Sequence, residues 1–168
     1  GSTMQYSASV CLAREGEELE IFLVRRARTT SFLSGFHAFP GGLLEPIDQR
    51  EDESLSQHIR RAAVRETWEE TGVQIDPDSL IELGQWVAPP YLVRPLTTHY
   101  FLSWSDGQTP LIDPEQGELD QGQWLTPGAA LELWEQGSLL LAPPTRVLLS
   151  LLQARRKNPE SVVLNVPE

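Results

Sequence analysis

Three carboxylates lie within five residues of one another near the middle of the chain. Glu66, Glu69 and Glu70 follow Arg65 directly and precede Gly72. Residues three or four apart share one face of a helix, so the three side chains can converge there. Like charges at this spacing repel by about 0.2–0.5 kcal/mol per pair in an isolated helix. A divalent cation would turn that repulsion into attraction, and oxygen-only ligands favour Mg²⁺ or Mn²⁺.

The ordinary alternative is a solvated acidic helix face, which is common in acidic proteins. Three neighbouring features favour a metal site instead. Gly41 and Gly42 form a turn ahead of the helix, and glycine lets backbone carbonyls approach a metal or a phosphate closely. Arg65 can pair with Glu69 at i,i+4, or with a neighbouring carboxylate, and hold it in place. Gly72 is placed to cap the carboxyl end of the helix. The sequence therefore predicts a metal site on this helix.

These residues resemble the signature of the Nudix hydrolases, G-x5-E-x7-R-E-U-x-E-E-x-G-U, in which U is a bulky apolar residue. The second half matches Arg65–Val73, which reads RETWEETGV, with Thr67 where the family has an aliphatic residue. The first half matches Gly42 followed six residues later by Asp48, where the family has Glu. The metal-binding half of the signature is therefore intact.

The two halves of the signature are separated by an insertion of nine residues, Gln49–Gln57. Its sequence, QREDESLSQ, is polar and charged, so we expect a surface bulge between loop and helix. An insertion at this place is similar to the peroxisomal coenzyme A diphosphatase branch of the family and its bacterial relatives. The stretches LVRRARTTSFLSGFHAFPGGLLEPID, WVAPPYLVRPLTTHYF and LAPPT also look like that branch.

The resemblance implies an α/β/α sandwich, in which a mixed sheet lies between helices. It also implies attack of water on a phosphoanhydride bond of a nucleoside diphosphate linked to another group. Mg²⁺ or Mn²⁺ would act as a Lewis acid and lower the pKa of bound water. Coenzyme A or an acyl-coenzyme A is the leading substrate. ADP-ribose, other nucleotide sugars and dinucleoside polyphosphates are the alternatives.

A different class of function is a Nudix module that binds a nucleotide or a partner protein without hydrolysing it. Such modules are expected to have lost one or more of the signature carboxylates. This chain keeps all three glutamates and Arg65. The hydrolase is therefore the favoured interpretation.

The resemblance also implies roles for the acidic residues. Glu66 and Glu70 are the principal metal ligands and Glu69 is a further ligand. The backbone carbonyl of Gly42, or that of Gly41, is an additional ligand.

In many Nudix enzymes a glutamate in the loop before a late strand binds metal or acts as the base. Glu118 is the candidate for this role, with Glu115 second. Either Glu66 or Glu118 serves as the base, acting through a metal-bound water. Arg65 is expected to orient the carboxylates rather than to touch the substrate.

Substrate contacts are expected from basic and aromatic side chains. Arg25 and Arg26 lead toward the glycine turn and offer bidentate recognition of a diphosphate, the alternative being a solvated strand end. Tyr91, Trp86 or Phe36 could stack on a base, the alternative being that such aromatics belong to the core. We retain Tyr91 as a substrate-binding candidate.

The local patterns predict the elements that position these residues. Strands are expected at Tyr6–Ala13 and Leu19–Val24, paired as a hairpin around the turn at 14–18, and at His37–Phe39, Leu80–Ala88, Thr97–Trp104 and Gln123–Leu125. His37 by itself is expected to be structural. A loop is expected at 106–121.

Helix signals are equally local. Ser54 with Gln57 has the spacing of a capping box, and Leu55, Ile59, Ala62 and Ala63 follow as an apolar face for the sheet. A second helix is expected to begin at Thr126-Pro127 and to be closed by Gly137. A last helix is expected from Arg146 to about Lys157, after Pro143-Pro144-Thr145.

The length of the chain limits its domain organisation. The 168 residues suit one domain, expected at 4–157, after an expression scar at 1–3 and before a tail at 158–168. The hydrophobic end of the tail, Val162–Leu164, has three roles open to it: packing on the domain, pairing with a partner chain, or leading into a further domain. A homodimer is a candidate assembly.

The net charge and the single cysteine limit the binding partners and the cellular location that we expect. The net charge of −11 disfavours a nucleic-acid polymer as partner but allows a small phosphorylated nucleotide screened by metal ions. No apolar run approaches the roughly 20 residues that span a bilayer, so no membrane partner is expected. Cys11 lies in an apolar run and has no second cysteine to pair with, which fits a core position and a cytoplasmic location.

Overall fold

A mixed sheet of seven strands runs through the part of the chain that the computed structural model describes, residues 4–30, 33–88 and 95–164. The strands are β1 (Gln5–Glu15), β2 (Leu19–Arg26), β3 (His37–Ala38), β4 (Gly41–Leu43), β5 (Ile81–Val87), β6 (Leu96–Trp104) and β7 (Leu119–Leu125). The helices are α1 (Leu55–Thr71), α2 (Pro127–Glu135) and α3 (Pro143–Ala154). The strand order is β3-β2-β1-β6-β5, while β4 pairs with β1 and β7 pairs with β2.

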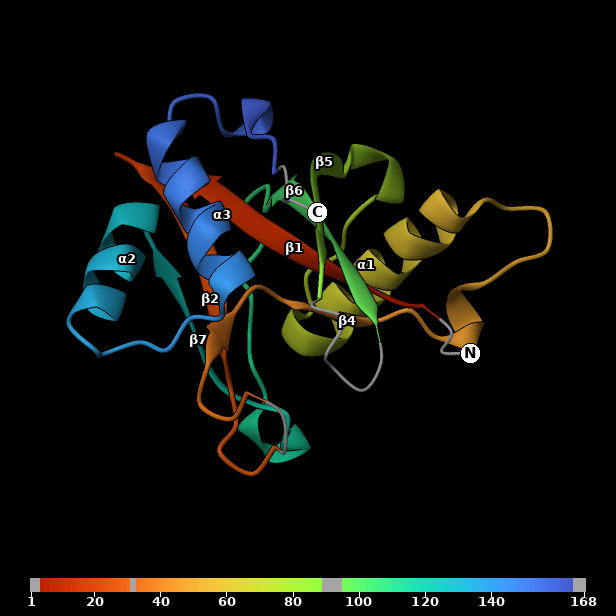
Figure 1. Ribbon diagram of the computed structural model, residues 1–168, viewed down its shortest axis with the longest axis horizontal. Helices are drawn as coiled ribbons and strands as arrows, with labels where there is room; N and C mark the ends of the chain where they lie inside the picture. The colour runs from red at the N-terminus through yellow and green to blue at the C-terminus, as the bar shows by residue number, and fades with distance from the viewer. Residues whose placement is uncertain (1–3, 31–32, 89–94, 165–168) are drawn as a thin grey trace.

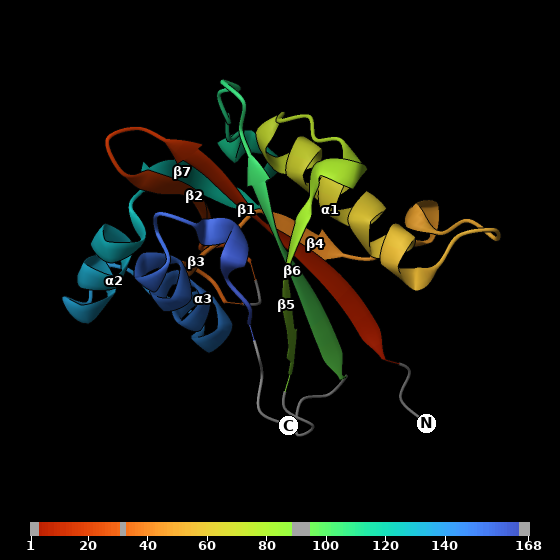
Figure 2. The ribbon, with the colours of Figure 1, turned by 90° about the horizontal axis from the view of Figure 1, so that it is seen from above.

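The helices cover both faces of this sheet. α1 lies against one face, and α2 and α3 lie together against the other (Figures 1 and 2). The predicted α/β/α sandwich is therefore confirmed. None of the helices in the described ranges is long and apolar enough to cross a membrane.

β1 is the strand from which the two layers are built. Four consecutive residues of β1 are fully buried: Val10, Cys11, Leu12 and Ala13. Because successive side chains of a strand point to opposite faces, Val10 and Leu12 enter the α1 layer while Cys11 and Ala13 enter the α3 layer. β1 pairs in parallel with β6 from Gln5 to Ala13 and antiparallel with β2 and β4. The predicted hairpin of the first two strands is confirmed.

The signals that bound α1 act as predicted. The Ser54 hydroxyl accepts a hydrogen bond from the Gln57 backbone N–H, and the Gln57 side chain accepts one from the Ser54 N–H, which completes the capping box. Gly72 ends the helix at φ 75°, and its N–H bonds the Trp68 carbonyl. Thr67 is fully buried, and its hydroxyl still has a hydrogen-bond partner because it donates to the Ala63 carbonyl at 2.7 Å.

One residue of the predicted apolar face of α1 is placed differently. Ile59, Ala62 and Ala63 are buried, but Leu55 is 42% exposed. Leu55 begins the helix within the inserted segment, which is exposed over most of its length and projects beyond the sheet (Figure 2). The insertion is thus a surface bulge, as expected, and its last three residues form the first turn of α1.

Long-range pairing moves several other boundaries. β7 begins at Leu119, inside the stretch expected to be a loop, because Leu119 pairs with Arg26 of β2. β1 continues to Glu15 for the same reason, since Glu15 pairs with Leu19. The last helix begins earlier than expected, at Pro143, and ends at Ala154.

The last described residues of the chain pack on the sheet. Val162 and Leu164 are 1% and 4% exposed and belong to the core of the α3 layer. The Leu164 N–H donates to the Leu83 carbonyl of β5, and Leu164 forms a parallel bridge with Gly84. Val162 and Leu164 therefore pack on the domain, which was one of the three roles open to this segment.

The αL cap of α1 makes a stability prediction. Replacing Gly72 by Ala should lower the free energy of unfolding by about 1 kcal/mol, because φ 75° is strained for a residue with a Cβ although space is free around it. Urea unfolding measures the change. Gly16→Ala is the matched control, because this glycine has free space without a positive φ. Equal stability of the two variants would contradict this account of the cap.

Candidate functional site

An arginine and a buried aspartate form the most constrained contact of the site. Arg65 donates from Nε to Asp48 Oδ1 at 2.8 Å and from Nη2 to Oδ2 at 2.9 Å. Asp48 is fully buried, and the Glu45 N–H also donates to it. Burial alone would raise the pKa of Asp48, but the Arg65 guanidinium and the Glu45 N–H together hold it below its ordinary value. The bidentate geometry fixes the plane of the guanidinium.

The third guanidinium nitrogen reaches back to the acidic helix. Arg65 Nη1 donates to Glu66 Oε1 and to Glu69 Oε1, each at 3.0 Å. The pairing expected from the i,i+4 spacing is therefore confirmed. Nη2 also donates to the Leu43 carbonyl of β4 at 3.2 Å, so Arg65 links α1 to the strand beside it.

The glycine turn lies directly against two of the glutamates. The Gly41 N–H donates to Glu70 Oε1 at 2.9 Å. A Cβ on Gly42 would lie 2.5 Å from the carboxyl carbon of Glu66, and one on Gly41 would collide with the Ala8 carbonyl. No larger residue could occupy either position without moving a carboxylate or a strand. Glycine is thus required here by close approach.

This packing places two carboxylates in a poorly solvated space. Burial raises the pKa of Glu66 to about 6, although Arg65 opposes the shift. Burial raises the pKa of Glu70 to about 8; the Gly41 N–H and the Arg26 charge act in the opposite direction, and the charges of Glu66 and Glu118 add to the rise. Both carboxylates therefore occupy a space that favours added positive charge.

Glu69 is placed differently from its two neighbours. Its side chain is 47% exposed and is held by Arg65. Within the described ranges, no group of three or more His, Cys, Asp or Glu side chains is arranged so that it could hold a metal ion. The expected convergence of all three glutamates is therefore not seen, and Glu66 and Glu70 are the pair that the fold brings to the glycine turn.

Glu118 and Arg26 come to the same region from the sheet. The Ala27 N–H donates to the Glu118 carbonyl at 2.9 Å, which fixes the start of β7 beside the end of β2. The charges of Glu118 and Arg26 both act on Glu70. Glu115, the second candidate, is exposed in a 3₁₀ turn that precedes Glu118.

Two further residues were predicted to bind the substrate, Arg25 and Tyr91. Arg25 donates from Nε to Asp120 Oδ1 at 2.6 Å, so its guanidinium is engaged within the fold. It pairs across the sheet with His37, which is 4% exposed, as expected for a structural histidine. Burial lowers the pKa of His37, and the nearby charge of Arg25 lowers it further. Tyr91 lies outside the described residues.

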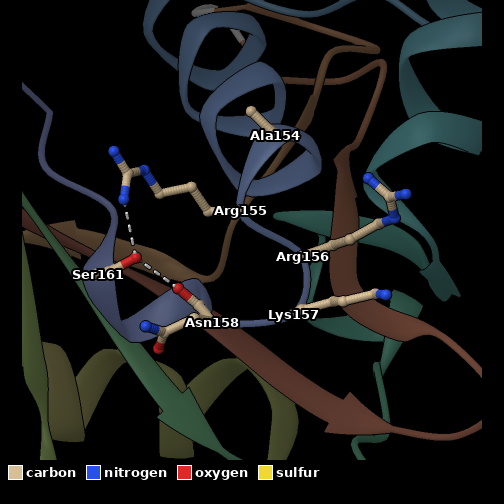
Figure 3. A pocket seen from close by; sticks show the side chains of 6 residues that line it. All are labelled: Ala154, Arg155, Arg156, Lys157, Asn158 and Ser161. Atoms are coloured by element: carbon tan, nitrogen blue, oxygen red, sulfur yellow. Dashed lines mark hydrogen bonds between the residues drawn. The ribbon is translucent and has the colours of Figure 1, made fainter.

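A basic hollow at the end of α3 is separate from this site. Its volume is about 260 Å³, and Arg155, Arg156 and Lys157 line it. Figure 3 shows the Arg155 side chain pointing away from those of Arg156 and Lys157, and Arg155 donates to the Ser161 hydroxyl at 3.3 Å. The three cations do not converge on one point, so the hollow is a poor anion site.

The sequence profile of the NUDIX domain matches residues 3–142 of the chain. The chain belongs to the Nudix family. A Caenorhabditis elegans protein named "Putative nudix hydrolase 7" is 25% identical over 178 aligned positions, which cover 85% of this chain. The alignment covers 58% of that relative's own length.

Solved Nudix structures share the fold. A NUDIX hydrolase from Alicyclobacillus acidocaldarius superposes with a TM-score of 0.80 at 23% identity, covering 98% of this chain and 99% of the other. The NUDIX domain of Shewanella oneidensis NrtR, solved with ADP ribose, superposes with a TM-score of 0.66 at 18% identity, covering 94% and 90%. At these identities the likeness establishes the fold alone.

Asp48 matches the first half of the Nudix signature, but the sequence alone did not indicate what its side chain contacts. The structure makes it the residue that fixes Arg65, and Arg61 joins it by donating to the Asp48 carbonyl at 3.0 Å. The spacing Gly42-x5-Asp48 was the available signal. Glu45, 3.3 Å from Arg65, had no signal of its own.

The buried ion pair makes a second prediction. Asp48→Asn should lower the free energy of unfolding by about 2–4 kcal/mol, because it leaves the Arg65 charge in a largely buried place without its main partner. Urea unfolding tests this. Glu20→Gln, which breaks the more exposed Arg14–Glu20 pair, is the control and should cost less than about 1 kcal/mol. Similar losses in the two variants would contradict the importance given to Asp48.

Proposed function

We propose that this Nudix protein is a metal-dependent hydrolase that cleaves a phosphoanhydride bond in a nucleoside diphosphate linked to a second group. The observation that carries the proposal is the pair Glu66 and Glu70, which are partly buried against Gly42 and Gly41 respectively. Two poorly solvated carboxylates at one place are unfavourable unless one takes up a proton or a cation joins them. The site therefore favours a cation and, through it, a diphosphate.

The donor set fits a hard divalent cation. Glu66 and Glu70 offer carboxylate oxygens, which suit Mg²⁺ or Mn²⁺. Glu118, whose charge acts on Glu70, is the candidate for a third carboxylate, and the Gly42 or Gly41 carbonyl is the candidate backbone ligand. Glu69 remains a candidate for a further ligand if it leaves Arg65. When bound, the metal supplies Lewis-acid stabilisation of the phosphate oxygens and lowers the pKa of bound water.

The residues of the chain itself have distinct tasks in this proposal. Arg65 orients Glu66 from its fixed place on Asp48, and the Gly41 N–H orients Glu70. Arg26 contributes positive charge for the diphosphate. Glu66 or Glu118 accepts the proton of the attacking water.

Coenzyme A or an acyl-coenzyme A is the proposed substrate. The resemblance of three stretches outside the signature to the coenzyme A diphosphatase branch supports this choice. Hydrolysis would release an adenosine bisphosphate and a phosphopantetheine.

ADP-ribose is the second candidate substrate, because the NrtR NUDIX domain was solved with that ligand. A screen of nucleoside diphosphate compounds with Mg²⁺, with products identified by mass spectrometry, separates these candidates. Release of phosphopantetheine supports coenzyme A, whereas AMP with ribose 5-phosphate supports ADP-ribose. Nucleotide binding by calorimetry without turnover of any compound would favour the non-catalytic module.

The paired carboxylates make a third prediction. Glu70→Gln should lower Mg²⁺-dependent kcat by about a thousandfold or more while the protein stays folded, because it removes one charge from the proposed metal site. Glu69→Gln should cost less, because Glu69 is half exposed and held by Arg65. Steady-state kinetics and circular dichroism measure both variants. Full activity of Glu70→Gln would refute the assignment.

The two arginines at the end of β2 make a fourth prediction. Arg26→Gln should raise KM for the diphosphate by about tenfold, because the positive charge of Arg26 acts at Glu70, where the diphosphate is proposed to bind. Arg25→Gln is its neighbour control and should change KM little, because Arg25 is bound to Asp120. A larger KM effect from Arg25 would reverse these assignments.

A further inference from the structure

Glu53 is the one residue of the insertion Gln49–Gln57 that is not exposed. The structure describes all nine of these residues, and the other eight are exposed. The side chain of Glu53 is 23% exposed. Removing a carboxylate from water is unfavourable unless a positive charge pairs with it, so the position of Glu53 needs a partner to explain it.

The partner is Arg61 of α1, which binds the insertion and the Nudix signature at the same time. Arg61 Nη2 donates to the Glu53 carboxylate at 2.7 Å, and Nη1 donates to the Asp48 backbone carbonyl at 3.0 Å. The hydrogen bond from Arg61 holds the pKa of Glu53 below its ordinary value, so the pair stays charged at neutral pH. One guanidinium thus joins the two ends of the exposed stretch between Asp48 and Glu53.

This contact lies at the residue on which the geometry of the site depends. Asp48 is the last residue before the insertion, and its carboxylate holds Arg65 by two hydrogen bonds at 2.8 and 2.9 Å. Arg65 in turn donates to Glu66. Residues 49–52, which follow Asp48, are exposed, and exposed loops move more than the elements they connect. Holding the Asp48 carbonyl keeps that movement away from the carboxylate.

Arg61 belongs to a row of side chains on α1 that holds the same segment. His58, Arg61 and Arg65 follow one another at spacings of three and four residues, so they share one face of the helix. His58 Nε2 accepts a hydrogen bond from the Arg50 N–H at 3.0 Å. Arg65 Nη1 lies 3.3 Å from the Glu45 carboxylate. The row therefore contacts the chain both before and after the start of the insertion.

The preceding residue, Arg60, anchors α1 by the same chemistry at another place. Its Nη1 donates to the backbone carbonyls of Pro77 and Leu80 at 3.0 and 2.9 Å. These contacts join α1 to the turn before β5, whereas the contacts of Arg61 lead to the site. Arg60 is therefore the matched comparison for a role that goes beyond anchoring the helix.

We propose that Glu53 and Arg61 are positioning residues, through which the insertion holds Asp48 and thereby the guanidinium that orients the acidic helix. The insertion is then part of the site as well as a surface bulge. Its effect on turnover rests on the proposed function, whereas its effect on the geometry of Arg65 does not. The two consequences are therefore measured separately.

The Arg65 Nε–H reports the geometry without any turnover, because it donates to the buried Asp48 carboxylate. Its exchange with water, followed by ¹⁵N NMR, should become about tenfold faster in Arg61→Gln, since the acceptor gains freedom to move away. Glu53→Gln, a change at a partly exposed side chain, should have the same effect to a smaller degree. Arg60→Gln should leave this exchange unchanged.

The backbone amides of β1 in the same samples report global unfolding. The inference is overturned if these amides share the faster exchange equally, or if Arg60→Gln has the effect of Arg61→Gln. It is also overturned if neither Arg61→Gln nor Glu53→Gln changes the exchange of the Arg65 Nε–H.

Steady-state kinetics with Mg²⁺ and the compound that the screen identifies test the effect on the reaction. Glu53→Gln and Arg61→Gln should each lower kcat by about fivefold and leave KM unchanged, because they alter the orientation of the carboxylates and not a substrate contact. Adding Glu53→Gln to Arg61→Gln should lower kcat no further, because Glu53 acts through Arg61. Arg50→Gln is the matched control for Glu53, because the Arg50 side chain is 67% exposed and lies 3.9 Å from that carboxylate, and it should not change kcat.

The two measurements separate this inference from the proposed function. If no compound is hydrolysed while the Arg65 exchange responds as expected, the proposed function fails and the positioning role stands. For an active enzyme, unchanged kcat in both single variants, a rise in KM alone, or additive losses in the double variant would overturn the inference.

Discussion

The proposed activity depends on the partial burial of two carboxylates, Glu66 and Glu70, against a glycine turn. Neither charge can be relieved by moving away, because the Gly41 N–H holds Glu70 and Arg65 holds Glu66. Arg65 gives only part of the compensation, since both oxygens of Asp48 already bind it. In the proposed function a further cation completes this compensation, and the negatively charged chain accepts a phosphorylated substrate through that cation.

The rest of the fold keeps this arrangement rigid. β4 pairs with Ser7, Ala8 and Ser9 of β1, which fixes the glycine turn, and α1 packs on the face of the sheet that Ala8 enters. The caps at Ser54 and Gly72 set both ends of α1. The pairing of β2 with β7 brings Arg26 and Glu118 to the same place from the other side. Four segments that are distant in the sequence thus meet around Glu70.

Local chemistry explains what the sequence could predict. Three features of α1 depend only on residues a few positions apart, so the sequence could predict them. They are the capping box at Ser54, the helix-ending glycine Gly72 and the i,i+4 pair of Arg65 with Glu69. The positions of Leu119 and Leu55 could not be predicted in this way, because strand pairing places the first and the extent of the sheet decides the burial of the second. The Arg25–Asp120 pair spans 95 residues, so no local pattern could show that Arg25 is bound within the fold while the charge of Arg26 acts on Glu70.

Anomalous diffraction from crystals soaked in Mn²⁺ tests the central claim most directly. The account predicts an anomalous peak between the carboxylates of Glu66 and Glu70, beside Gly41 and Gly42. The account would be contradicted if Mn²⁺ bound at other places in the crystal while no anomalous peak appeared between the unmoved carboxylates of Glu66 and Glu70.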